Sequence, residues 1–338
     1  MILLGKNLDE LEALVRAEEM PSYTGMQLAR WLYGSEAASF AEMSNLSKQS
    51  RTVLENKYQT GFSEHVKVSV SADGTRKYLF PTGGGRFIET AFMPEARRNT
   101  LCLSTQVGCK MGCLFCMTAR QGFQANLSAG EIVNQLRSLP ERNRVTNIVY
   151  MGMGEPFDNT EEVLKSLEIL TAPWGFAISP KKITVSTIGL IPGMIQFLEK
   201  TRCNLAISLH SPFDEERRKL MPVQHVYPIR DVIRELIRTD AGRQRKISFE
   251  YILFRGINDS DGHIREMARL LNKLPCRVNL MRFHPVPNAP LEGADEASLV
   301  RFRDALNAKG IIATIRQSRG IDIEAACGLL STKAMLSK

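Results

Sequence analysis

The feature that most constrains the fold is a repeated alternation of short apolar segments with longer amphipathic ones, which begins near residue 99. Stretches in which apolar residues recur every three or four positions separate six apolar segments, and this recurrence is the period of a helix with one buried face. The apolar segments are residues 147–153, 183–189, 204–210, 247–254, 277–283 and 311–316. Strands without a polar face, separated by helices, indicate a parallel sheet covered on both sides. We therefore predict an α/β fold, a partial (β/α)6 barrel, with residues 100–106 as a candidate seventh strand.

Polar residues occur where several of these predicted strands end. Gly154 and Glu155 follow the first of the six segments, Ser186 lies in the second, and Ser208 and His210 lie in the third. In folds of this kind the chemistry takes place at the carboxyl ends of the strands and in the loops that follow. These positions are therefore candidates for a functional site.

The N-terminal part of the chain has a different pattern. Residues 1 to about 60 show helical periodicity, whereas residues 65–93 alternate between apolar and polar side chains and contain the turn sequences "ADGT" and "TGGG". We predict a small N-terminal accessory domain of helices and hairpins at residues 1–92, followed by the core at residues 93–320.

The chain is basic, with a net charge of +8 from 44 Lys and Arg against 36 Asp and Glu. Such a charge fits either a well-solvated surface or a polyanionic partner such as nucleic acid. The basic residues gather at Arg97–Arg98, Lys181–Lys182, Arg217–Arg218–Lys219 and Arg243, Arg245, Lys246. No apolar run approaches the ~18–20 residues that cross a bilayer, and the first residues lack the features of a secretory signal. We expect a cytoplasmic protein without a membrane partner.

Three of the seven cysteines, Cys109, Cys113 and Cys116, have the spacing Cys-x3-Cys-x2-Cys. Thiolates bind soft metals, and zinc sites commonly use four protein ligands. A [4Fe–4S] cluster normally takes four thiolates, so three would leave one iron open. The spacing, with an aromatic residue before the last cysteine, resembles that of radical S-adenosylmethionine (SAM) enzymes, in which the methionine part of SAM chelates the open iron. Cys203 and Cys276 border apolar segments, and we expect both to be buried structural residues.

Beyond the cysteine triplet, the chain closely resembles the radical SAM RNA methyltransferases of the RlmN/Cfr family. The matching stretches are "TLCLSTQVGCKMGCLFCMTARQGF", "MGMGEP", "STIGLIPGM", "LAISLHSP", "KLMP" and "RQSRGIDIEAACGLL". They run in family order across residues 89–330, and the helical N-terminus resembles the accessory domain of the family. The triplet alone is typical of the whole superfamily, whereas "AACG" together with Cys102 is far more specific.

The resemblance implies methylation of an adenosine ring carbon, which has no nucleophilic character, with two SAM molecules used per turnover. The first methylates Cys327 in "AACG", which makes residues 321–338 a segment that carries the methyl-accepting cysteine. The second is cleaved at the cluster, and its deoxyadenosyl radical takes hydrogen from the S-methyl group. The carbon radical adds to adenine, and Cys102 resolves the protein–RNA crosslink by forming a transient disulfide with Cys327. For this role Cys102 should be accessible and partly ionised.

The resemblance also assigns roles to further side chains. It implies that Glu89 is a proton acceptor. It implies that SAM contacts Gly154, Glu155, Ser186, Ser208, Leu209, His210 and His284. A backbone glycine allows close approach to the ligand, and the Glu155 carboxylate can pair with the SAM ammonium group. Many family members have an asparagine at the position of His284, and Asn288 close by could serve instead.

By the same resemblance, the partners are 23S ribosomal RNA at the peptidyl transferase centre, transfer RNA at an anticodon-loop adenosine, and a one-electron reductant such as flavodoxin or ferredoxin. Basic clusters would contact RNA phosphates. Two alternatives remain open at this point. One is an antibiotic-resistance enzyme that methylates carbon 8 rather than carbon 2 of adenine. The other is a zinc-stabilised RNA-binding protein without catalysis.

Overall fold

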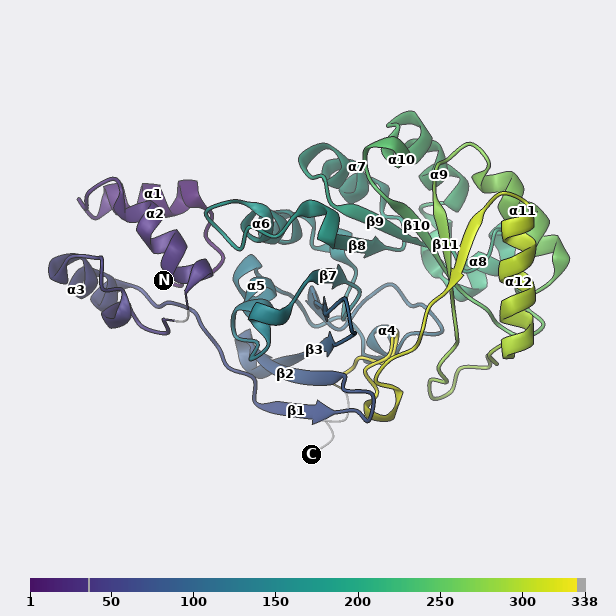
Figure 1. Cartoon of the computed structure of the whole chain (residues 1–338), viewed down its shortest axis with the longest axis horizontal. Coiled ribbons are helices and arrows are strands. Elements are labelled where there is room, and N and C mark those ends of the chain that lie inside the picture. Colours follow the sequence, from purple (N-terminus) through teal and green to yellow (C-terminus); the bar gives the residue numbers. More distant parts are fainter. Residues whose placement is uncertain (36, 333–338) are drawn as a thin grey trace.

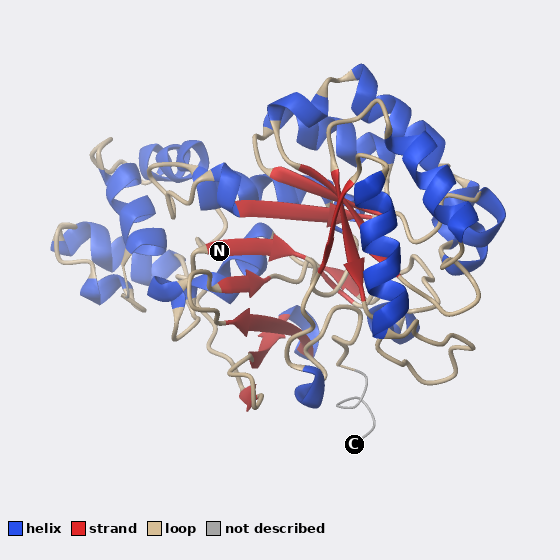
Figure 2. Ribbon diagram, turned by 45° about the vertical axis from the view of Figure 1, so that its right-hand side comes forward, coloured by secondary structure: helices blue, strands red, loops and turns tan. Residues whose placement is uncertain are grey.

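The computed structural model describes residues 1–35 and 37–332. Its main feature is one ten-stranded sheet in the order β1-β2-β3-β4-β7-β8-β9-β10-β11-β12, curved and covered by helices (Figures 1 and 2). The strands are β1 Lys67–Val70, β2 Arg76–Thr82, β3 Arg86–Met93, β4 Thr100–Cys102, β5 Gln106–Val107, β6 Ala125–Asn126, β7 Asn147–Tyr150, β8 Ile183–Thr187, β9 Asn204–Ser208, β10 Ile247–Ile252, β11 Arg277–Met281 and β12 Ile312–Ile315. The helices are α1 Leu8–Ala17, α2 Thr24–Ala29, α3 Lys48–Lys57, α4 Met117–Gln121, α5 Ala129–Arg137, α6 Thr160–Thr171, α7 Ile191–Lys200, α8 Asp214–Leu220, α9 Ile229–Arg238, α10 Ala241–Gln244, α11 Asp261–Leu271 and α12 Glu296–Ala308.

The strands from β4 to β12 in the ten-stranded sheet are paired in parallel. This confirms the predicted α/β class and the β/α repeat. Residues 100–102 form β4, so the candidate seventh strand is real and the described sheet contains one β/α unit more than the six of the predicted barrel. Because β4 has only three residues, the apolar pattern alone did not decide whether this segment is a strand.

Each predicted strand ends earlier in the structure than the apolar run that predicted it. The run 204–210 ends as a strand at Ser208, because the backbone turns sharply at His210, which has a positive φ of 54°. The run 247–254 likewise ends at Ile252. The apolar residues beyond these ends line the loops at the carboxyl edge of the sheet rather than extending it.

The strands predicted for the accessory region belong to the same sheet as the core. β1, β2 and β3 pair antiparallel, and β3 joins β4 with Ala91 opposite Cys102. The helices α1 to α3 lie to one side of the sheet (Figure 1). The N-terminal segment contacts α5 closely, because a Cβ on Gly5 would lie 2.3 Å from the Gly130 nitrogen. None of the helices in the described residues is long and apolar enough to cross a membrane.

Two members of the predicted basic clusters are buried rather than displayed on the surface. Arg245 donates to the backbone carbonyls of Leu198 (2.8 Å) and Thr201 (3.0 Å), and it is buried. Arg217 is fully buried. Both guanidinium groups satisfy backbone carbonyls, so the prediction that these two arginines contact RNA phosphates is wrong.

Candidate active site

Two adjoining cavities open where the parallel strands end. The cysteine cavity has an empty volume of about 900 Å³ and is lined by the three clustered cysteines and by residues at the ends of β7 to β11. The outer cavity has an empty volume of about 700 Å³, and its wall includes Cys102, Arg316 and His284. Cys327 lines both cavities. The C-terminal segment thus brings one thiol to the boundary between them.

Cys109, Cys113 and Cys116 all line the cysteine cavity. Their loop is fixed from outside, because the Leu114 N–H donates to the Leu220 carbonyl at 3.0 Å. Burial raises the pKa of Cys109 to about 12 and that of Cys113 well above its usual value, and the neighbouring thiols add to both shifts. Thiols packed this way become anions only when a positive centre compensates for them, as iron does.

The donor set fits a [4Fe–4S] cluster. Three soft thiols face one cavity, and the cavity continues past them to polar residues at the strand ends. Within residues 1–35 and 37–332, three or more His, Cys, Asp or Glu side chains nowhere converge as they would around a single metal ion. A cluster requires no such convergence, because each thiolate binds a different iron. The three thiols and the space beyond them therefore fit a [4Fe–4S] cluster.

The Gly154–Glu155 turn after β7 is built to hold its backbone in one position. Gly154 has a φ of 98°, and a Cβ there would lie 2.6 Å from the Gln106 Cβ, so only glycine fits. The Glu155 carboxylate accepts hydrogen bonds from the Thr187 hydroxyl (2.5 Å) and from the N–H groups of Ile188 (3.0 Å) and Phe157 (3.1 Å). Burial raises its pKa to about 7. The carboxylate thus joins the ends of β7 and β8, in addition to lining the cavity.

Ser186, Ser208 and His210 also line the cysteine cavity. The His210 ring packs edge-on against Phe115 with centroids 4.6 Å apart, and its Nδ1 accepts the Ile252 N–H at 3.0 Å. Burial lowers its pKa to about 3, so the ring is neutral and carries its proton on Nε2. Leu209 is fully buried behind the cavity and does not belong to its lining; its N–H donates to the Glu250 carbonyl at 3.0 Å.

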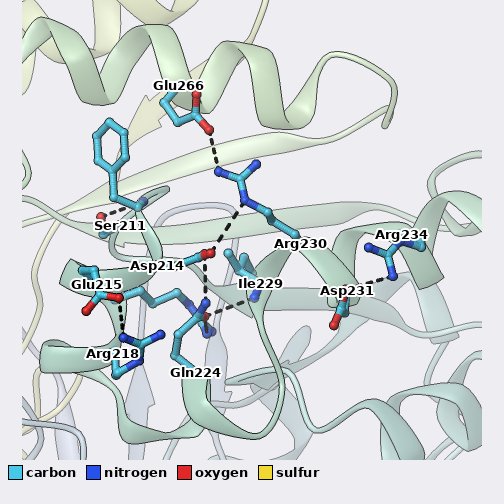
Figure 3. A network of polar contacts seen from close by, with 12 residues as sticks. Ser211, Asp214, Glu215, Arg218, Gln224, Ile229, Arg230, Asp231, Arg234 and Glu266 are labelled. Carbon is cyan, nitrogen blue, oxygen red and sulfur yellow. Dashed lines mark hydrogen bonds and ion pairs between the residues drawn. The ribbon is translucent and has the colours of Figure 1, made fainter.

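Arg217 holds this edge of the sheet together, and the sequence analysis missed that role. Its guanidinium donates to the carbonyls of Ile188 (2.8 Å), Ser208 (3.0 Å) and Leu209 (3.2 Å). It also donates to Gln224 Oε1 at 2.6 Å. Figure 3 shows how Gln224 is fixed in turn, by donating to Asp214 (3.0 Å) and accepting from the Ile229 N–H (3.1 Å). The sequence offered little sign of this role: Arg217 lies three residues before Leu220, a spacing that places the two on the same side of a helix.

Cys102 and Cys327 both line the outer cavity. Cys327 is exposed, whereas Cys102 is buried among Ala91, Val149 and Ala325. Burial raises the pKa of Cys102 to about 12, so the expectation that it is accessible and partly ionised is wrong for this conformation. The physical reason is the C-terminal segment, because Ala325 packs over the strand and removes the thiol from solvent.

Glu89 lies outside the linings of both cavities. It is buried and paired with Lys77 at 2.9 Å, and it accepts the N–H of Ser331 at 3.0 Å. Burial raises its pKa, although Lys77 and the Ser331 N–H oppose that shift. The carboxylate therefore ties β3 to the C-terminal segment that bears Cys327.

His284 and Asn288 do not line the cysteine cavity. His284 lies in the wall of the outer cavity, where its Nε2 is 2.9 Å from the Ser318 hydroxyl. Asn288 is exposed, and its carbonyl accepts from Arg120 at 3.2 Å. Among the cysteines expected to be structural, Cys203 is buried as predicted, whereas Cys276 is half-buried.

Two protein families and several known relatives match this chain. The profile of the radical SAM superfamily matches residues 103–271, and that of the ribosomal RNA large subunit methyltransferase N-terminal domain matches residues 1–59. A probable dual-specificity RNA methyltransferase RlmN from Parabacteroides distasonis is 52% identical over 98% of this chain and 96% of its own length. The dual-specificity RNA methyltransferase RlmN of Syntrophus aciditrophicus is 42% identical over 98% of this chain and 97% of its own length.

Two solved structures also resemble this chain. The crystal structure of a radical SAM methyltransferase from Sphaerobacter thermophilus superposes with a TM-score of 0.92 at 41% identity, covering 98% of this chain and 99% of that one. The hydrogenase maturase HydG of Carboxydothermus hydrogenoformans, at 17% identity and a TM-score of 0.50 over 66% of this chain and 55% of its own, shares the fold.

Proposed function

This chain belongs to the RlmN family of radical SAM RNA methyltransferases, and from that premise we propose that it methylates carbon 2 of adenosine in 23S ribosomal RNA and in transfer RNA. The relatives at 52% and 42% identity are named for dual specificity. The stretches "RQSRG" and "ARQGF" resemble the housekeeping branch of the family, which favours carbon 2 over carbon 8. We assign SAM binding to the cysteine cavity and the reaction with RNA to the outer cavity.

One observation supports this proposal most strongly: Cys327 lines both the cavity of the clustered cysteines and the cavity that contains Cys102. A methyl-accepting thiol must meet SAM on one side and the RNA base and the resolving thiol on the other. The position of Cys327 in the linings of both cavities fits both requirements.

Cys109, Cys113 and Cys116 would hold a [4Fe–4S] cluster, which when present supplies the electron that cleaves SAM to a deoxyadenosyl radical. The residues that line the cavity would bind and orient SAM. Gly154 lets the backbone approach the amino group of SAM, and the hydroxyls of Ser186 and Ser208 offer donors and acceptors to its polar parts. Neutral His210 can donate from Nε2, and Leu209 shapes the wall from behind.

The Cys327 thiol first takes a methyl group from SAM. A 5′-deoxyadenosyl radical takes a hydrogen atom from that S-methyl group, and the carbon radical so formed adds to the ring carbon of adenine and links Cys327 to RNA. The radical adduct gives up one electron to a one-electron acceptor, and the ring carbon then loses its proton. Glu89 accepts a proton, which its burial favours by raising its pKa. Because Glu89 bonds Ser331, this role needs the C-terminal segment to shift when RNA binds. Cys102 then attacks the Cys327 sulfur, a disulfide forms, and methylated RNA is released.

We assign residues 1–92 to RNA contact, residues 93–320 to the catalytic core and residues 321–338 to the segment that carries Cys327; residues 333–338 lie outside the described part of the chain. His284, in the outer cavity, would contact the adenosine of bound SAM or the target base. An external flavodoxin or ferredoxin would supply the electron, and the substrates imply a cytoplasmic protein.

Mass spectrometry of nucleosides from ribosomal and transfer RNA tests the proposal. A deletion strain should lose 2-methyladenosine from both RNAs, and the gene on a plasmid should restore it. Persistence of 2-methyladenosine in the deletion strain would contradict the proposal. Loss of 8-methyladenosine instead would identify the enzyme as the carbon-8 branch.

A further inference from the structure

Cys102 lies in an apolar wall, yet a resolving cysteine reacts as a thiolate. Its packing partners Ala91, Val149 and Ala325 cannot stabilise an anion. Two polar groups act on the thiol in favour of its ionised form, namely the backbone N–H of Met151 and the guanidinium of Arg316. The other titratable group that acts on it is Cys327, which opposes ionisation. Arg316 is thus the cation available to Cys102.

Arg316 directly follows β12, and its side chain forms part of the outer cavity together with Cys102 and Cys327. Its backbone N–H donates to the Leu280 carbonyl at 2.8 Å, which fixes the start of the side chain. The guanidinium donates to Glu250 Oε2 at 3.3 Å and to the Met151 sulfur at 3.4 Å. These contacts hold the cation against the wall that contains Cys102.

Glu250 holds Arg316 without cancelling its charge. The carboxylate is 4% exposed in its side chain and Arg316 is 35% exposed, and Glu250 also accepts from Ser248 (3.0 Å) and Asn279 (2.8 Å). Those two donors bind Oε1, whereas Arg316 meets only Oε2, through one contact of 3.3 Å. Because this contact is longer than a tight charge-assisted hydrogen bond, part of the guanidinium field remains available to the cavity. The effect is mutual, because both Cys102 and Cys327 help to raise the pKa of Arg316.

We propose that Arg316 activates Cys102: its cation, fixed by Glu250 in the wall of the outer cavity, stabilises the Cys102 thiolate as it forms and as it attacks Cys327. The inference rests on the proposed function, because it concerns the resolving step. In that step the Cys102 thiolate, its proton already lost to water in the outer cavity, forms an S–S bond with the Cys327 sulfur. The bond from that sulfur to the methylene carbon on RNA breaks, and its electron pair takes up a proton to complete the methyl group.

The first test measures the thiol directly and does not depend on turnover. Protein carrying its cluster is alkylated anaerobically with iodoacetamide at several pH values, and the modification of each cysteine is followed by peptide mass spectrometry. Arg316→Gln should slow the alkylation of Cys102 about tenfold at pH 8. Loss of the cation should raise the pKa of Cys102 by about one, which lowers its thiolate fraction about tenfold. Arg316→Lys keeps the charge and should restore most of the rate.

Two controls separate charge from structure. Arg282 lines the same cavity and is also 35% exposed, but its carboxylate partner is Glu296. It meets Arg316 only at the backbone carbonyl, to which it donates at 3.0 Å, so Arg282→Gln should leave the alkylation of Cys102 unchanged. Cys276 is an internal control, because burial alone raises its pKa and its alkylation should not respond to either substitution. Equal Cys102 rates in Arg316→Gln and wild type would overturn the proposal.

The second test follows the covalent protein–RNA intermediate. Arg316→Gln should accumulate the adduct, and raising the pH should speed its decay, whereas Arg316→Lys should resemble wild type. A wild-type level of adduct in Arg316→Gln would refute the role of Arg316. If wild-type protein neither methylated RNA nor formed an adduct, the proposed function would fail, while the alkylation result would still decide what Arg316 does to Cys102.

Discussion

Replacing Arg217 by methionine should destabilise the protein strongly, although the change removes a charge from the interior. Methionine keeps much of the volume but none of the donors, so the carbonyls of Ile188, Ser208 and Leu209 lose their partner. At about 1 kcal/mol for each buried acceptor left unsatisfied, the loss is about 3 kcal/mol before any repacking. Entry of water would recover part of it, and loosening of Gln224 would add to it.

Arg218→Met is the matched control. Arg218 follows Arg217 in the same helix, but it pairs with Glu215 near the surface (Figure 3), so its loss should change stability by about 0.5 kcal/mol or less. Equilibrium unfolding in urea measures both variants. Because Ile188 and Ser208 line the cysteine cavity, calorimetry should also show weaker SAM binding in Arg217→Met alone. Equal stability and equal SAM affinity in the two variants would refute this account of the strand ends.

Three further predictions concern the same cavities. Gly154→Ala should cost about 2 kcal/mol or more and abolish SAM binding, because its Cβ meets Gln106 at 2.6 Å; Gly122→Ala, at an open position with φ of 79°, should bind SAM normally in the same titration. Burial raises the pKa of Glu155 to about 7, so the folded protein binds more protons than the unfolded chain between pH 4.5 and 7. Urea unfolding should therefore show stability falling as pH rises through that window, more steeply than in Glu155→Gln; equal slopes would contradict the assignment. Cys102→Ala should trap protein covalently joined to RNA, visible as a nuclease-sensitive band on a denaturing gel, and clean protein with normal turnover would exclude the resolving role.

The sequence was informative where local pattern decides structure. Apolar runs separated by helical periodicity predicted the parallel sheet, and the cysteine spacing predicted three thiols at one cavity. Strand ends were less predictable, because an apolar residue beyond a strand can line a loop as well as a sheet. His210 illustrates this, since its positive φ ends the run that its neighbours would continue.

Contacts between distant segments could not be predicted from local pattern. Cys102 is buried because Ala325 packs on it from the C-terminal segment, and nothing near Cys102 in the sequence shows that. Arg217 lies beside Arg218 and Lys219 in a run that is typical of a solvated surface, yet it satisfies carbonyls on two strand-end loops. In both cases long-range packing decided the environment of the side chain.

The central claim is that the methyl group reaches RNA through Cys327 rather than directly from SAM. Turnover with SAM deuterated in its methyl group, followed by mass spectrometry of the methyladenosine, tests this claim most directly. Transfer through the S-methyl group of Cys327 should leave two deuterium atoms in the product, because one leaves with 5′-deoxyadenosine and a proton replaces it. A product that retains all three deuterium atoms would show direct transfer and would contradict the account.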